Sequence, residues 1–151
     1  QVEYARSRGA HTIALTCNRD SPLERAADFA IITEVGPEVL AGSSRMKAGT
    51  AHKMVLNMIS TGAMTRLGYV YGNLMVSVWT KNEKLIQRAI RIVEQATGAD
   101  HEAAARALKA SGNRTPVAVV MLAAGVTKSQ AAAALKKTKG HVRQAIAQAG
   151  S

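Results

Sequence analysis

The stretch that decides the fold is "HTIALTCNRDSPLERAADFAII", residues 11–32. Its apolar centre, Ile13-Ala14-Leu15, predicts a short buried strand that ends at the polar turn "NRDSP". Ser21 and Pro22 are typical of the N-cap and the first position of a helix, and residues 29–32 predict a second strand. The stretch therefore predicts a strand, a short helix and a second strand in succession.

The flanking segments extend this pattern. "VEYARSRGA", residues 2–10, predicts the last turns of a helix closed by Gly9. Helix and strand alternate in this way in parallel α/β sheets, so we expect the second half of an α/β domain whose opening strands lie upstream of Gln1. Downstream, apolar residues from Met46 to Gly62 recur at helical spacing and predict one long helix over residues 43–67.

The rest of the chain predicts mainly helices. Residues 68–80, "GYVYGNLMVSVWT", fit short strands and an irregular connection or short helix equally well. Thr80 and Glu83 predict a capping box that opens a helix ending before Gly98, and Asp100 opens another that stops near Gly112.

Three short helical units complete the chain, over residues 115–125, 127–140 and 141–150. Thr115 is expected to cap the first, which Pro116 then begins, and Thr127 and Gln130 form a capping box at the second. We divide the chain into residues 1–67 (half of an α/β domain), 68–99 (a connecting segment and helix) and 100–151 (a small helical domain).

Composition restricts the functional classes. The chain has 151 residues, of which 47% are hydrophobic and 20% charged, so it is expected to fold. The lone Cys17 excludes an internal disulfide and a cysteine-based zinc site, and no metal-ligand spacing or cofactor is expected. No apolar run reaches membrane-spanning length and the first residues are too polar for a signal peptide, which favours a cytoplasmic protein.

The net charge of +10 is concentrated near the end of the chain. Residues 101–151 contain eight Lys or Arg and one acid, Glu102. A basic region of this kind is able to bind nucleic acid, a membrane surface or an acidic partner. A solvated cationic surface explains it more simply, so we expect neither nucleic acid nor membrane binding.

The stretch "EVGPEVLAGSSRMKAGTAHK", residues 34–53, is the main candidate for a site. It follows a predicted strand, and ligands of open parallel sheets bind beyond the carboxyl ends of the strands. Ser43 or Ser44 is expected to cap the next helix, whose free N–H groups attract anions. Glu38 is a candidate base or sugar ligand, and a salt bridge to Arg45 is its structural alternative.

These residues resemble a known family. The run from Val35 to Val76 is similar to the signature region of the N-acetylmuramic acid 6-phosphate etherases, bacterial enzymes with a sugar isomerase (SIS) domain. The glucokinase regulatory protein is related to them. The similarity extends to the end of the chain and implies the C-terminal half of such a protein.

The resemblance implies an activity. Members of the family cleave the lactyl ether of N-acetylmuramic acid 6-phosphate to N-acetylglucosamine 6-phosphate and D-lactate during cell-wall recycling. They use no metal, and acidic residues move the protons during elimination of lactate and addition of water. The two glutamates assigned to this chemistry lie in the half upstream of Gln1, so no catalytic residue is assigned here and the isolated chain is expected to be inactive.

The resemblance also implies substrate contacts. In SIS sugar isomerases the Glu of the "GPE" loop lies beside the sugar ring, which makes Glu38, with Ser43 and Ser44, the candidates in the first part of the chain. A lid lysine of the relatives corresponds to Pro116 here, so Asn113 and Arg114, close by, are the candidates in the second part, with Arg114 as a substitute cation.

Partners follow from the same resemblance. A sugar phosphate is the expected substrate, and pairing of SIS domains predicts a homodimer in which the long helix is covered. The last unit also resembles ubiquitin-associated three-helix (UBA) modules, which we interpret as a similarity of fold. A non-catalytic sugar-phosphate sensor and a basic helical interaction module remain the alternative functions.

Overall fold

The computed structural model describes residues 1–150, which divide into two compact units. The first comprises Gln1–Thr61 and the second begins at Gly62. Helix α3 (Lys47–Arg66) crosses the boundary between them. Each unit is described by itself below.

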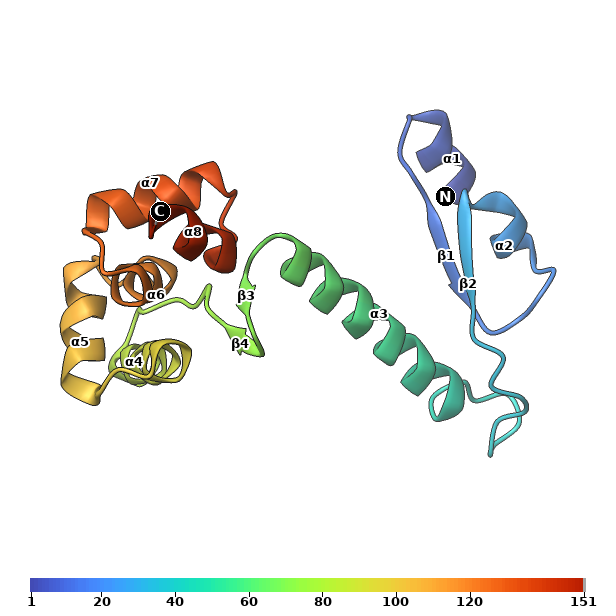
Figure 1. The fold of residues 1–151 in the computed structure, drawn as a ribbon. Helices are drawn as coiled ribbons and strands as arrows, with labels where there is room; N and C mark the ends of the chain where they lie inside the picture. Colours follow the sequence, from blue (N-terminus) through green and yellow to red (C-terminus); the bar gives the residue numbers. More distant parts are fainter. Residues whose placement is uncertain (151) are drawn as a thin grey trace. The chain divides into compact units, whose positions relative to one another are not determined.

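The first unit contains a small parallel sheet. Its elements are α1 (Val2–Ser7), β1 (Ile13–Thr16), α2 (Pro22–Ala26) and β2 (Phe29–Ile32). The strands lie side by side in parallel, from the pair Ile13 and Phe29 to the pair Thr16 and Ile32 (Figure 1). A parallel pair requires a crossover connection, which α2 provides. The predicted succession of helix, strand, helix and strand is confirmed.

Local hydrogen bonds position these elements. Ser21 caps α2 as predicted, because its Oγ accepts the N–H of Glu24 at 3.2 Å. At the start of the strands, the Asp28 carboxylate accepts both the N–H and the hydroxyl of Thr12, each at 2.8 Å. These hydrogen bonds lower the pKa of Asp28 from its usual value. The carboxylate thereby ties the entry of β2 to the entry of β1.

Helix α3 is shorter than predicted and largely uncovered. It begins at Lys47, four residues after the predicted start at residue 43, and ends at Arg66. Only Ala48 of its twenty residues is buried. Apolar side chains are at least 45% exposed at five of its positions, Met54, Leu56, Met58, Ile59 and Met64. The helix therefore contributes little to the core of the unit.

The second unit begins with a hairpin and continues as a helical bundle (Figure 1). Strands β3 (Val70–Tyr71) and β4 (Leu74–Met75) pair antiparallel around a turn at Gly72. This pairing settles the ambiguous segment in favour of short strands. The helices are α4 (Glu83–Thr97), α5 (His101–Ala110), α6 (Thr115–Ala124), α7 (Lys128–Lys137) and α8 (Val142–Ala149).

Helix α6 is the centre of this bundle. It packs against α4, α5, α7 and α8. The side chains from Val117 to Val120 are fully buried, so this helix is apolar on every side. Leu108 from α5, Val93 from α4 and Val142 from α8 fill the same core. All five helices therefore share one hydrophobic core.

The predicted helix starts are partly confirmed. Asp100 caps α5 and Thr127 forms the predicted capping box with Gln130. The N-cap of α4 is Asn82, whose side chain accepts the N–H of Leu85 at 2.9 Å, so the predicted box at Thr80 is wrong. Thr80 instead donates its hydroxyl to the carbonyl of Asn113 at 3.2 Å, in a distant turn.

The start of α6 also differs from the prediction. Thr115 is the first residue of the helix and Arg114 is its N-cap. The Thr115 side chain is fully buried, and its hydroxyl has no hydrogen-bond partner within residues 1–150. The predicted capping role of Thr115 is therefore wrong.

A membrane span requires a helix of sufficient length and apolarity. Within residues 1–150 no single helix is both long and apolar enough to cross a bilayer. The successive helices α6 and α7 meet the length and composition criteria only as a pair, and they are bent by 109°.

Candidate functional site

The carboxylate of Glu38 sits at the N-terminus of α3. Its two oxygens accept the backbone N–H groups of Lys47 and Ala48, each at 3.0 Å. These are among the N–H groups that lack a partner within a helix and that carry its partial positive charge. Glu38 therefore caps α3 from nine residues away and closes the loop that connects β2 to this helix.

This contact changes the acidity of Glu38. The N–H groups of Lys47 and Ala48 lower its pKa from the usual value, because they stabilise the ionised carboxylate. A carboxylate with a lowered pKa is a weaker base. In this conformation the geometry suits Glu38 as a hydrogen-bond acceptor that orders a loop, and less well as a proton acceptor.

The capping roles predicted for Ser43 and Ser44 are wrong, because α3 starts later and Glu38 occupies its N-terminus. Within residues 1–150 neither hydroxyl makes a hydrogen bond to protein, so both are free to contact a ligand. No ion pair between Glu38 and Arg45 is present in the described residues. The salt bridge considered as the structural alternative for Glu38 is therefore absent, and the helix N-terminus takes its place.

A second cluster lies at the carboxyl ends of the strands. Cys17 follows β1 and Thr33 follows β2, and their Sγ and Oγ1 atoms are 3.3 Å apart. The Nε2 atom of His52, from α3, lies 3.3 Å from the same sulfur. Because ligands of parallel sheets bind at this edge, the cluster marks the same region as the Glu38 loop.

Sequence reasoning did not find this cluster, although the register of the strands contains a signal for part of it. Thr16 pairs with Ile32, so the next residue of each strand, Cys17 and Thr33, must also be neighbours. His52 is 35 residues from Cys17 and no local pattern connects them. Within residues 1–150 no group of three or more His, Cys, Asp or Glu side chains is arranged to hold a metal ion.

Asn113 and Arg114 belong to the second unit, in the turn between α5 and α6. Asn113 has a positive φ of 59°, and its N–H donates to the carbonyl of Leu108 at 2.9 Å. The N–H of Arg114 donates to Oγ of Ser111 at 3.0 Å, and this Oγ donates to the Leu108 carbonyl at 2.6 Å. The backbone of the turn is thus fixed, and the exposed side chain of Arg114 projects from it.

Arg114 lines a cleft of about 530 Å³ within the second unit. The segment after β4, the start of α6 and the end of α7 form its walls. Its lining comprises two cations, two hydroxyl-bearing side chains and an apolar and glycine surface: Arg114, Lys136, Tyr69, Ser77, Gly68, Pro116, Ala132, Leu135 and Gly140. No carboxylate is among these residues.

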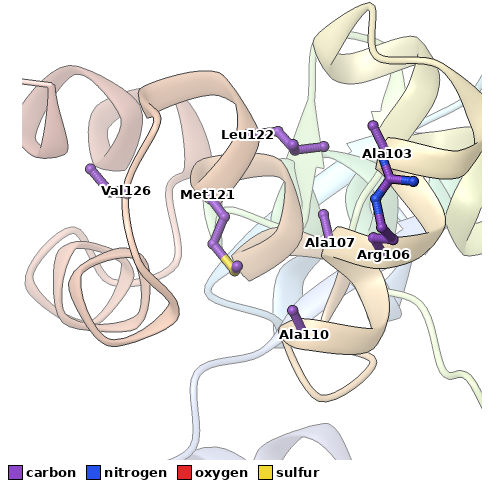
Figure 2. A pocket seen from close by; sticks show the side chains of 7 residues that line it. All are labelled: Ala103, Arg106, Ala107, Ala110, Met121, Leu122 and Val126. Carbon is purple, nitrogen blue, oxygen red and sulfur yellow. The ribbon is translucent and has the colours of Figure 1, made fainter.

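A second hollow, of about 390 Å³, lies between α5 and α6. Figure 2 shows the small and apolar side chains that line it, among them Ala107, Met121 and Leu122, with Arg106 at one side. Arg106 is already paired with Glu102 at 3.2 Å. This hollow therefore offers little to fix the orientation of a polar ligand.

The first part of the chain matches a domain family. Residues 1–62 match the SIS domain family, and this range contains the sheet, the loop and most of α3.

The chain also matches curated relatives over nearly its whole length. It is 50% identical to N-acetylmuramic acid 6-phosphate etherase 1 of Bacillus licheniformis over 145 residues, which are 96% of this chain and 48% of the relative. Identity to the etherase of Mycolicibacterium smegmatis is 51% over 96% of the chain and 49% of the relative. Identity to the etherase of Symbiobacterium thermophilum is 61%, over 83% of this chain and 42% of the relative.

These matches have two consequences. The chain spans about half the length of the curated relatives it matches. The two units, of which the first carries the Glu38 loop, are both included in the aligned range, because that range covers 96% of the chain. The resemblance of this chain to one half of the N-acetylmuramic acid 6-phosphate etherases, and of its first 62 residues to the SIS domain family, is thereby confirmed.

Proposed function

We propose that this chain is part of a bacterial N-acetylmuramic acid 6-phosphate etherase and supplies substrate-contacting residues, while the acid and base glutamates come from the other half of the protein. The identity of about half of all residues to three such etherases carries the proposal. The reaction is cleavage of the lactyl ether of the sugar phosphate, which releases D-lactate. A cytoplasmic location accompanies this role in cell-wall recycling.

Within this proposal, Glu38 contacts the sugar and Ser43 and Ser44 lie beside it. The Glu38 carboxylate uses both oxygens to hold the N-terminus of α3, and each oxygen keeps a lone pair for a sugar hydroxyl. The hydroxyls of Ser43 and Ser44 are free in the described residues and lie in the loop that Glu38 closes. In the second unit, taken by itself, Arg114 with Asn113 beside it is proposed as a cation for a sugar phosphate.

The first unit is proposed to pair with a second copy. Its support is the uncovered apolar surface of α3, including Met54, Leu56 and Met58, together with Ile13 and Phe29 of the strands, which are 61% and 65% exposed. Exposed apolar patches of this kind mark interaction surfaces. Sedimentation equilibrium of the chain measures the association directly, and a monomer at every concentration would contradict the pairing.

The last three helices are proposed to share the fold of ubiquitin-associated modules. Packing of α6 against both α7 and α8 supports this similarity. The similarity concerns the fold alone, and ubiquitin binding is not part of the proposal.

The activity is tested with a chimera. The part of the Mycolicibacterium smegmatis etherase that this chain does not match is fused to residues 1–151, and D-lactate release from N-acetylmuramic acid 6-phosphate is measured. The chimera is expected to be active and the isolated chain inactive. Activity of the isolated chain would overturn the assignment of the catalytic groups to the other half.

Glu38 is tested in the same chimera against a matched carboxylate. Glu38→Gln is expected to lower kcat/KM by about tenfold or more, since hydrogen bonds to charged groups contribute about 1.5–3 kcal/mol. Glu34→Gln is the control, because Glu34 is exposed in the same loop and pairs with Arg19 at 2.9 Å. Equal effects of the two changes would contradict a substrate contact at Glu38. A folded chimera that binds the sugar phosphate without releasing lactate would favour a regulatory protein instead.

A further inference from the structure

The cleft beside Arg114 has the composition of an anion site. Its volume of about 530 Å³ falls in the range of about 300–1,000 Å³ that is typical of small-molecule pockets. Arg114 and Lys136 bring two positive charges to it, and Tyr69 and Ser77 bring hydroxyl groups. A site with this lining favours a small molecule that carries negative charge at one end.

Arg114 and Lys136 are unpaired cations within residues 1–150. In the part of the chain that the structure describes, neither Arg114 nor Lys136 forms an ion pair, whereas Arg106 of the same unit pairs with Glu102. Both side chains are exposed at the cleft, so each remains hydrated and available. An anion that enters the cleft is able to pair with both without breaking an existing contact.

The cleft is held in shape by contacts at two places. The backbones of Gly68 and Gly140 approach so closely that a Cβ on Gly68 would lie 2.8 Å from the carbonyl carbon of Gly140. Thr80 donates to the Asn113 carbonyl at 3.2 Å and thereby fastens the segment that contains Ser77 to the turn that contains Arg114. A preformed site loses less entropy when it binds.

We propose that this cleft binds a small phosphomonoester, with the phosphate between Arg114 and Lys136 and the body of the molecule against Pro116, Ala132 and Leu135. A phosphomonoester carries a charge of about −1.5 to −2 at pH 7, which matches two cations better than a single carboxylate does. The apolar wall and the hydroxyls of Tyr69 and Ser77 suit a sugar-sized body. The inference shares Arg114 with the proposed function and adds Lys136, Ser77 and Tyr69 as ligand contacts.

The complete 151-residue chain is titrated with glucose 6-phosphate, inorganic phosphate and glucose by calorimetry, while backbone amide NMR shifts locate the binding. Saturable binding of glucose 6-phosphate is expected, with weaker binding of inorganic phosphate and none of glucose. The largest shifts are expected at Gly68, Ser77 and Lys136. Equal affinities for glucose 6-phosphate and inorganic phosphate would overturn the assignment of a sugar-sized body.

Two adjacent lysines provide a matched pair of variants. Lys136 lines the cleft and Lys137 does not, and both are exposed on α7, so either change leaves the core intact. Lys136→Met is expected to raise the Kd for glucose 6-phosphate by about tenfold, as for loss of a hydrogen bond to a charged group, while Lys137→Met leaves it nearly unchanged. Equal weakening by both variants, or no saturable binding by the wild type, would overturn the proposal.

Ligand binding at the cleft and lactate release by the chimera are tested independently. Lactate release by the chimera without binding at the cleft refutes only this inference. Binding at the cleft without lactate release refutes only the proposed activity.

Discussion

Of two buried hydroxyl groups between α5 and α6, one is hydrogen-bonded and the other is not, so their removal is expected to have opposite effects on stability. Both Ser111 and Thr115 are fully buried. Oγ of Ser111 donates to Leu108 at 2.6 Å and accepts from Arg114 at 3.0 Å, whereas Oγ1 of Thr115 has no partner within residues 1–150. Burial of an unpaired hydroxyl costs about 1–3 kcal/mol by protein mutational measurements.

Thr115→Val is therefore expected to stabilise the second unit by about 1 kcal/mol. Valine has nearly the same shape and a similar helix propensity, so the main change is removal of the unpaired hydroxyl. Ser111→Ala is expected to destabilise by about 1–3 kcal/mol, because it removes the partner of the part-buried N–H of Arg114.

Thermal unfolding followed by circular dichroism measures both changes. A gain of 1 kcal/mol corresponds to a rise in Tm of roughly 4–8 °C for a unit of 60–100 residues. Urea unfolding at 25 °C provides the free energies directly. Loss of stability in Thr115→Val as large as that in Ser111→Ala would refute the assignment of an unpaired hydroxyl.

Three further predictions concern helix ends and backbone contacts. Because hydrogen bonds lower the pKa of folded Glu38, its stabilisation of α3 is complete above the ordinary glutamate pKa and is lost as the pH falls through the lowered value. At that low pH, the amide exchange rates at the start of α3 should exceed those expected from the pH dependence of exchange alone. The variant Glu38→Gln should abolish this excess. Gly68→Ala should destabilise by about 2 kcal/mol or more through positive φ and a backbone clash, whereas Gly72→Ala, with positive φ and open space, should cost about 1 kcal/mol, both read from urea unfolding. Asn82→Ala should cost about 1 kcal/mol by the same measurement, since Asn82 and not Thr80 caps α4.

Local rules were sufficient where the deciding contact is local. The strands at residues 13–16 and 29–32 follow from their apolar runs, and the box of Thr127 with Gln130 follows from a spacing of three residues. These local rules fail where a residue distant in sequence caps the helix instead of the adjacent one. Helix α3 was expected to start at its own serines, but its N-terminal N–H groups are bound by Glu38, nine residues upstream.

The same limit explains the rest of the candidate site. Thr80 was predicted to cap the next helix, yet the carbonyl of Asn113, 33 residues away, competes for its hydroxyl. The contact between Cys17 and His52 and the cleft between Arg114 and Lys136 also join segments that sequence spacing does not relate. The candidate residues were found because they resemble a family motif, while their contacts required the fold.

The exposure of α3 links assembly to local order. A helix of twenty residues with one buried side chain depends mostly on its own hydrogen bonds, whereas most helices in proteins gain their stability from packing of an apolar face. Any surface that covers its apolar side chains therefore adds its binding free energy to helix formation. Glu38 can bind the N-terminus of α3 only while that N-terminus is helical, so pairing of the kind proposed above would make the order of the candidate sugar site a function of protein concentration.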